Sequence, residues 1–334
     1  MNEIGPSSIP VVIPCHTERR WSAILAAVES VRSQTRPCSA VLVVDHNNAL
    51  LERLRTHCAR YWPDTSTASV SVLANESDRG VSGARNTGAN AAVGPLIAFL
   101  DDDAVADLKW LETLSSTFAD ASVVGAGGVV KPAWSARQPH WFPPEFGWVF
   151  GLTNLMDGDL EIRYVRNVWS LNMMVRSDAF RSVGGFRSTF GKVGSVARPE
   201  DTDLCLRMTA AIPNGRWALA PRARVEHDVP ADRATLTYFL RRCWQEGVGK
   251  RQLLAMLGHG KTVLDSEMQF MNRDVPAALA REARGVLRRR DYHAAARLAV
   301  LLFGTATTVA GFAVPNPRQR SSKAAELRQP VPGV

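Results

Sequence analysis

Residues 96–103 read LIAFLDDD, a short apolar run that leads directly into three consecutive aspartates. A run of five apolar residues without a polar member predicts a strand buried on both faces, which is typical of a parallel sheet covered by helices. The three aspartates then follow at the end of that strand. The segment therefore predicts both a fold class and the edge of the sheet at which chemistry is expected.

The upstream sequence is built in the same way, because short apolar runs alternate with amphipathic stretches. We expect strands at residues 10–14 (PVVIP), 40–45 (AVLVVD) and 68–73, and helices at residues 21–31, 50–61 and 82–92. This alternation predicts an α/β domain with a parallel sheet flanked by helices. Functional residues gather at the carboxyl ends of such strands. Here those ends read Cys15-His16-Thr17-Glu18, Asp45-His46-Asn47 and Asp101-Asp102-Asp103.

Residues 132–150 are rich in proline and aromatic residues and have no helical period, so we expect a long ordered loop. Beyond about residue 233 the pattern becomes helical. Residues 298–314 (LAVLLFGTATTVAGFAV) are uncharged and follow three arginines at 288–290. We expect residues 1–232 to form the α/β domain and residues 233–334 to form a basic helical extension that ends in a flexible tail.

The composition and the distribution of charge indicate which kinds of partner the protein binds. The chain has 334 residues, 46% of them hydrophobic, and a formal net charge of +8. The charge lies in the last third, since residues 230–334 contain 17 Lys and Arg against 8 Asp and Glu. No aromatic or groove-reading motif accompanies it, so we expect no nucleic-acid partner. An anionic membrane surface fits the basic extension better.

The N-terminus and the cysteines predict where the protein acts. The first ten residues carry neither a basic nor an apolar run, so we expect no signal peptide and a cytoplasmic protein, with possible peripheral contact at the inner face of the cell membrane. Five cysteines without C-x-x-C spacing argue against a disulfide framework and a zinc site. They are expected to be reduced and mostly structural.

The aspartates at 101–103 are the first chemical signal. Adjacent carboxylates repel one another unless they share a cation, and hard oxygen ligands suit Mg²⁺ or Mn²⁺ holding a diphosphate. An exposed acidic turn that caps the next helix is the alternative. Asp45 could bind a ribose or a base edge, or could be a helix cap.

Two further positions carry candidate chemistry. Glu200 and Asp201 open an amphipathic helix, whose start favours an ionised carboxylate that could accept a proton from a hydroxyl group. An N-terminal cap explains the same pair. His227 follows a strand-like stretch and could ligate the metal, although a lone histidine is often structural.

Together these motifs resemble the family 2 glycosyltransferases, in particular a bacterial branch. The resemblance covers residues 10–230 in the order of the family. The motifs that carry it are Val11-Val12-Ile13-Pro14, Val43-Val44-Asp45, Arg79-Gly80-Val81-Ser82-Gly83-Ala84-Arg85-Asn86, Phe99-Leu100-Asp101-Asp102-Asp103, Asn172-Met173, Gly184-Gly185-Phe186, Glu200-Asp201-Thr202-Asp203-Leu204 and His227.

The resemblance implies a GT-A type nucleotide-diphospho-sugar transferase fold, an inverting mechanism and a divalent metal, Mn²⁺ or Mg²⁺. It implies Asp201 as general base with Glu200 beside it, and Asp103, Asp101 and His227 at the metal. The donor would be a UDP-, GDP- or dTDP-sugar, and the acceptor is unknown. The donor site would be formed by Pro14, His16, Glu18, Asp45, Arg79, Arg85, Asp101 and Asp102. We expect Trp169, Asn172 and Trp148 at the sugar or acceptor pocket, although packing into a local core explains the tryptophans equally well.

Two segments depart from the family pattern. Asp45-His46-Asn47-Asn48 stands where many relatives have D-D-G-S, and Cys15-His16-Thr17-Glu18 replaces the commoner T-Y-N-R. The contacts to the nucleobase are less defined as a result.

Three alternatives stay open at this point. A dehydrogenase or nucleotidyltransferase on a related sheet is disfavoured, because no G-x-G-x-x-G follows the first strand. A transferase that acts on polyprenyl-phosphate or other lipid-linked sugars at the membrane fits the C-terminal segment. An inactive membrane-associated scaffold is disfavoured by the intact aspartates at 101, 103 and 201.

Overall fold

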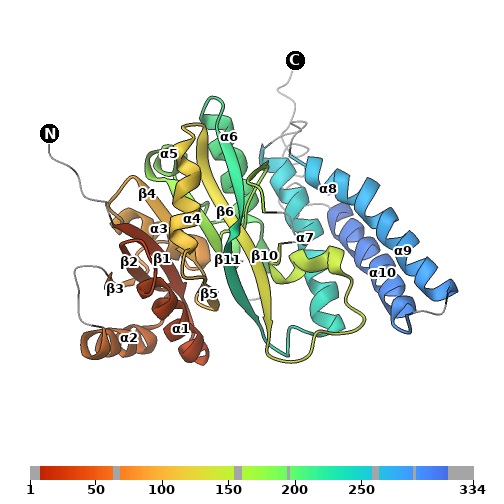
Figure 1. Ribbon diagram of the computed structural model, residues 1–334, viewed down its shortest axis with the longest axis horizontal. Coiled ribbons are helices and arrows are strands. Elements are labelled where there is room, and N and C mark those ends of the chain that lie inside the picture. Colours follow the sequence, from red (N-terminus) through yellow and green to blue (C-terminus); the bar gives the residue numbers. More distant parts are fainter. Residues whose placement is uncertain are drawn as a thin grey trace, which may run out of the picture. The chain divides into compact units, whose positions relative to one another are not determined.

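A computed structural model describes residues 8–62, 68–153, 160–193, 196–257, 263–288 and 291–314 (Figure 1). The chain divides into two compact units. The first contains residues 1–139 and 144–234, and the second contains residues 140–143 and 235–334. The division lies close to the boundary expected after residue 232, but residues 140–143 belong to the second unit.

The first unit is built on one mixed sheet of nine strands within the described residues, in the order β3-β2-β1-β4-β8-β6-β11-β5, with β7 paired to β11. The predicted parallel half is present. It consists of β1 (Ile9–Cys15), β2 (Cys38–Val44), β3 (Ala68–Ala74) and β4 (Leu96–Leu100). The pairs β1–β2, β2–β3 and β1–β4 are all parallel, so their carboxyl ends meet at one edge.

The other half of the sheet is mixed. It contains β5 (Ala104–Ala106), β6 (Val123–Trp134), β7 (Arg163–Val165), β8 (Asn172–Arg176) and β11 (Arg216–Val229). β8 runs antiparallel to both β4 and β6, and β11 runs parallel to β6. β5 pairs antiparallel with β11 and sets Ala104 opposite His227. This register places His227 beside the residue that follows the third aspartate.

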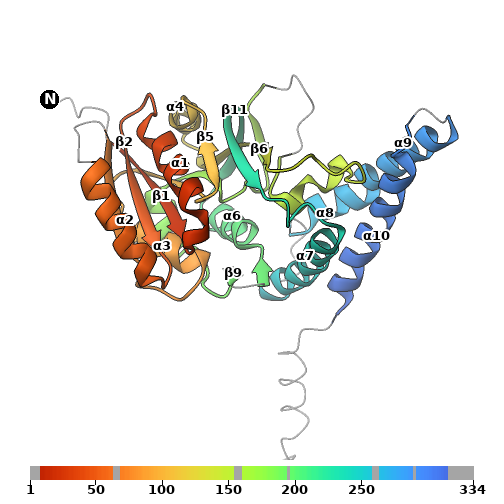
Figure 2. The same ribbon diagram turned by 90° about the horizontal axis from the view of Figure 1, so that it is seen from below.

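Helices cover both faces of the sheet. They are α1 (Trp21–Arg32), α2 (Asn48–Tyr61), α3 (Val81–Ala91), α4 (Trp110–Ser116), α5 (Ser177–Ser182) and α6 (Glu200–Ala211), with one-turn helices η1 (Glu18–Arg20) and η2 (Thr117–Ala119). Figure 2 shows α1 and α4 on one side of the strands and α3 and α6 on the other. A separate hairpin joins β9 (Gly191–Val193) to β10 (Val196–Arg198).

The small residues of α3 let the helix lie close to the sheet. A Cβ atom at Gly88 would fall 2.4 Å from Val12 Cγ1 and 3.0 Å from Val43 Cγ2, so only glycine fits there. The underlying core includes Phe99, Phe180 and Phe186, whose rings lie 5.3–5.6 Å apart. Close packing therefore fixes α3, which carries Arg85, against β1 and β2.

The aromatic segment at 132–150 differs from the long loop that we expected. It begins inside β6 and ends in the 3₁₀ helix η3 (Pro144–Phe150). β6 extends to Trp134 because its last residues pair with β11, with Pro132 opposite His227. Trp134 stacks edge-on against Phe150 at 5.2 Å.

The second unit is helical in its described part, as expected from the sequence. It contains α7 (Leu236–Leu257), α8 (Asp265–Gln269), the π-helical turn η4 (Phe270–Asp274), α9 (Val275–Leu287) and α10 (Ala294–Ala313). α10 packs against α7 and α9. Its start at Ala294 makes it four residues longer at the N-terminal end than the apolar run at 298–314.

Candidate active site

Arg85 joins two carboxylates that are far apart in the sequence. Its guanidinium Nη2 lies 2.7 Å from Asp101 Oδ1 at the end of β4, and Nη1 lies 3.0 Å from Glu200 Oε1 at the start of α6. The arginine is 2% exposed and lies over the ring of Phe186, 5.3 Å from its centroid. Ser170 Oγ is 3.5 Å from the same Glu200 oxygen. Arg85 is thus a buried link between β4 and α6, and its expected position beside the nucleotide stays a prediction.

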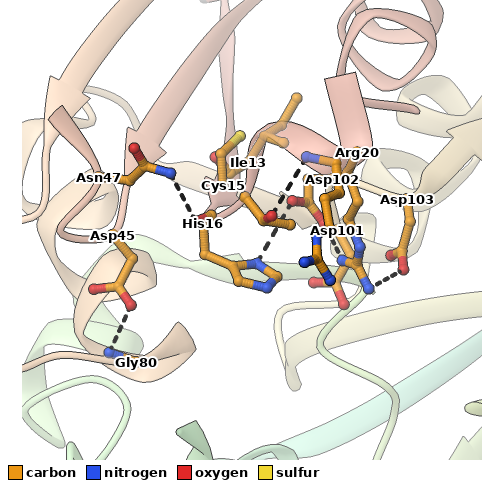
Figure 3. A network of polar contacts seen from close by, with 12 residues as sticks. Ile13, Cys15, His16, Arg20, Asp45, Asn47, Gly80, Asp101, Asp102 and Asp103 are labelled. Atoms are coloured by element: carbon orange, nitrogen blue, oxygen red, sulfur yellow. Dashed lines mark hydrogen bonds and ion pairs between the residues drawn. The ribbon is translucent and has the colours of Figure 1, made fainter. Parts of the chain in front are cut away.

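Asp102 and Asp103 are both buried, at 2% and 5% exposure. Arg20, at the end of η1, reaches both of them: Nη1 lies 2.5 Å from Asp102 Oδ1 and Nη2 lies 2.7 Å from Asp103 Oδ2 (Figure 3). Burial raises the pKa of Asp102 to about 7, against the lowering effect of Arg20. Asp102 is therefore enclosed by protein, in contrast to its expected contact with the nucleotide.

His227 faces Asp103 across the sheet edge. Its Nδ1 lies 3.0 Å from the carbonyl oxygen of Phe150 and donates to it, so Nε2 is directed at Asp103 Oδ1, 3.4 Å away. Arg233 Nη1 lies 3.7 Å from the other oxygen of Asp103. Burial would raise the pKa of Asp103, but His227 and Arg20 outweigh it and hold that pKa below its usual value.

The pair formed by Asp103 and His227 fits one side of a divalent-cation site. Asp103 Oδ1 is buried and has no hydrogen-bond partner in the described part of the chain, while the carbonyl of Phe150 orients the imidazole. Across the same described residues, no group of three or more His, Cys, Asp or Glu side chains is arranged to hold an ion. Mg²⁺ and Mn²⁺ commonly keep water and substrate phosphate oxygens as their remaining ligands, so two protein ligands suffice. Asp101, expected to share the cation, is paired with Arg85 instead.

Asp45 is held at the end of β2 by several donors. Its Oδ1 accepts from Asn75 Nδ2 at 2.7 Å and lies 2.8 Å from His46 Nδ1. Its Oδ2 accepts from the Gly80 N–H at 3.0 Å (Figure 3). Gly80 has φ +121°, which favours glycine and turns its N–H toward the carboxylate. His46, where many relatives have an acid, also adopts a positive φ of 50°. Asp45 thereby connects β2 to the segment that starts α3.

Asp201 lies in the first turn of α6, as expected. It is 6% exposed, and its Oδ1 accepts the backbone N–H of Thr202 at 2.7 Å. The positive end of the helix stabilises an ionised carboxylate at this position. Asp203, two residues further on, is fully buried and paired with Arg207 at 2.8 Å, which identifies it as structural.

The remaining expected donor residues fall into two groups. Glu18, His16 and Arg79 are exposed near the strand ends, and His16 Nδ1 lies 3.9 Å from Asp102 Oδ2 (Figure 3). Pro14 is buried within β1. The exposure of Glu18, His16 and Arg79 is compatible with contact to a ligand. Pro14 can contribute to a donor site only through the backbone around it.

The expected acceptor residues also divide. Asn172 is fully buried; its Oδ1 accepts from Trp110 Nε1 at 2.7 Å, and its Nδ2 donates to two backbone carbonyls at 3.2 Å. This placement corrects the expectation that Asn172 faces a sugar. Trp169 and Trp148 are partly buried, and Trp148 packs on Phe146 with the ring centroids 5.4 Å apart.

Sequence reasoning missed Arg20 and Asn75. Arg20 appears in the sequence only as the second of two arginines after Glu18, and its partner Asp102 lies 82 residues away. Asn75 follows β3 and bonds Asp45, the Asp78 carbonyl and Thr87. Its position at a strand end was the signal that could have identified it.

Comparisons with known proteins identify the family of the chain. The family model described as Glycosyl transferase family 2 matches residues 11–184. The chain belongs to this family. The matched range contains Asp45, Arg85 and the three aspartates at 101–103. The protein is accordingly a nucleotide-sugar glycosyltransferase.

Curated relatives of this transferase include an archaeal and a bacterial protein. The glucosyl-dolichyl phosphate glucuronosyltransferase of Haloferax volcanii is 30% identical over 246 residues, which cover 73% of this chain and 76% of that protein. The succinoglycan biosynthesis protein ExoM of Rhizobium meliloti is 31% identical over 188 residues, or 54% of this chain and 55% of that protein.

Solved structures confirm the GT-A type fold. The mannosyltransferase PcManGT of Pyrobaculum calidifontis, in complex with GDP-Man and Mn²⁺, superposes with a TM-score of 0.56 at 13% identity, covering 97% of this chain and 83% of that chain. GalNAc-T7 with UDP, GalNAc and Mn²⁺ gives a TM-score of 0.51 at 16% identity, covering 75% and 51%. Both likenesses concern the fold alone.

Proposed function

We propose that this family 2 transferase moves a sugar from a nucleoside diphosphate sugar to an acceptor hydroxyl by single displacement, with inversion at the anomeric carbon. The observation that carries the proposal is the tether Asp101–Arg85–Glu200. It fixes the start of α6, where Asp201 lies, to the end of β4, which leads into Asp103. A proton acceptor and a diphosphate site are thereby held on adjoining elements.

Asp201 is the proposed general base. It accepts the proton of the acceptor hydroxyl while the hydroxyl oxygen forms a bond to the anomeric carbon. The bond from that carbon to the diphosphate oxygen breaks, and the nucleoside diphosphate leaves with the electron pair. One displacement reverses the anomeric configuration. Glu200 accepts from Arg85 and positions the helix start.

Asp103 and His227 are the residues proposed to hold a divalent cation, Mn²⁺ or Mg²⁺. When bound, such a cation stabilises the negative charge that develops on the departing diphosphate. Arg20 and Arg233 keep Asp103 ionised from its other oxygen. Both structural neighbours were solved with Mn²⁺, which supports this choice of ion.

The donor side is proposed at Asp45, His16, Glu18 and Arg79, beside the ends of β1 and β2. The exposed side chains of His16, Glu18 and Arg79 are available to a nucleotide. One structural neighbour was solved with UDP and the other with GDP-Man, which keeps both nucleotides as candidates together with dTDP. Trp148 and Trp169 are proposed to line the sugar or acceptor side.

For the acceptor, a lipid-linked sugar is the second candidate. The relative from Haloferax volcanii is named for transfer to glucosyl-dolichyl phosphate. We place the protein in the cytoplasm, peripheral at the inner face of the cell membrane, where such acceptors are accessible.

The test is product analysis. The full-length protein is first screened for thermal stabilisation by UDP-, GDP- and dTDP-sugars with Mn²⁺, since a ligand stabilises in proportion to its occupancy. The product formed from the stabilising donor is then examined by proton NMR. An anomeric configuration opposite to that of the donor supports single displacement. A retained configuration, or turnover unaffected by chelation of divalent metals, contradicts the proposal.

A further inference from the structure

α10 has a single charged residue, Arg297, among its 20 residues. That side chain turns away from solvent: it donates to Glu282 Oε2 on α9 and also pairs with Asp291, and it is 18% exposed. Residues 298–314 that follow carry no charge at all. The solvent side of α10 therefore has no ionised group of its own.

One face of α10 is fixed against the helices of its own unit. A Cβ atom at Gly247 of α7 would lie 2.0 Å from the Thr308 carbonyl oxygen, and one at Gly311 would lie 2.4 Å from the Trp244 carbonyl oxygen. The backbones of α7 and α10 thus touch through small residues. The buried residues of α10 are Ala294, Val300, Leu301, Gly304 and Gly311.

The opposite face is exposed and apolar. Leu302, Phe303 and Val309 are 53%, 65% and 50% exposed. Exposed alanines extend the same face at three- and four-residue intervals, at positions 295, 306, 310 and 313. A surface helix normally presents charged and polar residues to water, so an apolar outward face along about 30 Å of helix requires a partner.

The turn between α9 and α10 adds exposed apolar and basic side chains. Leu287 is 81% exposed and Tyr292 is 95% exposed, and Arg284 and Arg288 are exposed beside them. In the sequence, two further arginines stand at positions 289 and 290, outside the described residues. Figures 1 and 2 both show α9 and α10 side by side, so this turn lies at one end of the apolar face.

We propose that the exposed face of α10 and the α9–α10 turn dock onto an anionic lipid bilayer, with the helix lying in the interface. The apolar side chains can insert among the acyl chains of such a bilayer, and the neighbouring arginines can bind its anionic head groups. This inference does not depend on the proposed reaction.

The contacts of α10 favour lying on the bilayer over crossing it. Its length of 20 residues is sufficient for a span, and α10 is the one helix in the described part of the chain that passes this test of length and composition. However, its packed face contacts helices with ionised side chains: Arg251 donates to the Phe312 carbonyl, and Glu282 binds Arg297. A spanning α10 would either carry these charges into the hydrocarbon or lose its packing.

The test is co-sedimentation of the full-length protein with vesicles of phosphatidylcholine alone or with one quarter phosphatidylglycerol. We expect binding to the anionic vesicles. The double variant Leu302→Ser/Phe303→Ser should lower the partition coefficient at least tenfold on anionic vesicles, because two apolar side chains are removed from the interface. Arg284→Gln/Arg288→Gln should lower it about fivefold per arginine, and only on anionic vesicles.

Val93→Ser is the matched control, since Val93 is an exposed apolar residue of the first unit, at 88% exposure, and should bind like the wild type. Circular dichroism and melting curves confirm that each variant is folded. Equal binding by the wild type and the Leu302/Phe303 variant overturns the proposal. In another outcome, the wild type fails to bind vesicles and forms a dimer that the Leu302/Phe303 variant does not form. That result overturns the proposal and assigns the exposed face of α10 to contact with a second copy of the chain. Retention in membranes after carbonate washing identifies a spanning helix and also overturns it.

Discussion

Arg85 Nη1 lies 3.0 Å from Glu200 Oε1, although 115 residues separate the two in the sequence. The same guanidinium holds Asp101, so the start of α6 is fixed to the end of β4. The proposed base, Asp201, is the next residue after Glu200. Any account of the chemistry therefore depends on this buried arginine, even though it has little access to a substrate.

Replacement of Arg85 should destabilise the first unit. Arg85→Met leaves Asp101 and Glu200 without their shared cation, and breaking a buried ion pair costs about 3–5 kcal/mol. Urea unfolding measures the loss. Arg79→Met is the control, because Arg79 is exposed and should change the free energy of unfolding by less than about 0.5 kcal/mol. A wild-type unfolding curve for Arg85→Met would show that the tether carries no stability.

Removal of the divalent metal should abolish transfer, and Mn²⁺ or Mg²⁺ should restore it. Asp103→Ala should also weaken donor binding, because the diphosphate loses its bridging cation. Asp107→Ala, which removes an exposed carboxylate in the same region, should bind donor normally. Calorimetric titration with and without Mn²⁺ measures the donor affinity of the Asp103→Ala and Asp107→Ala variants and so distinguishes them. Full activity in EDTA would exclude the metal role.

The cysteines should be unreactive in the native protein. All five are buried and free of disulfides. Burial raises the pKa of Cys38 to about 11 and, against weaker opposing interactions, that of Cys243 to about 12, so few thiolates exist at pH 8. A thiol reagent should label none of them until guanidinium unfolds the chain and exposes five. Rapid labelling of the folded protein would contradict the burial of at least one cysteine.

The second unit should lose stability in acid through Glu282. Burial would raise the pKa of this carboxyl, but hydrogen bonds from Arg297 and Arg281 outweigh it and hold the pKa below its ordinary value. A depressed pKa stabilises the fold above the unfolded value of about 4.3, and that contribution is lost as pH falls through the folded pKa. The melting temperature of Glu282→Gln should therefore lie below the wild type at pH 7, and the difference should shrink below about pH 4. If the difference in melting temperature between the variant and the wild type stayed constant from pH 7 to below about pH 4, the ionisation of Glu282 would not be the cause of the acid sensitivity.

The parallel half of the sheet could be predicted from the sequence because each of its strands is a continuous apolar run. The bounds of β1, β2 and β3 differ from the expected ranges by at most two residues, and β4 has the expected bounds. The same reasoning could select the candidate site residues at 101–103, at Asp45 and at the start of α6. Each of them directly follows a predicted strand or opens a predicted helix, and the neighbouring sequence is enough to recognise such a position. The family match and the fold comparisons confirm the family and the fold, while the roles of these residues stay predictions.

The partners of these residues could not be predicted in the same way. Arg20 binds Asp102 across 82 residues, and Arg85 reaches Glu200 across 115. Such contacts depend on how the helices pack on the sheet, which no local pattern encodes. The aromatic segment was misread for a similar reason, because strand β6 continues through Pro132 only where β11 lies beside it.

The central claim is that Asp201 is the base, and Asp201→Asn tests it most directly. Asparagine keeps the shape and caps a helix about as well as aspartate, so the melting temperature should stay near the wild-type value. Asparagine cannot accept the proton of the acceptor, so turnover should fall by roughly 10²- to 10⁴-fold while donor affinity changes little. Near wild-type turnover in a folded Asp201→Asn protein would contradict the account, because the proton would then have to leave through another group.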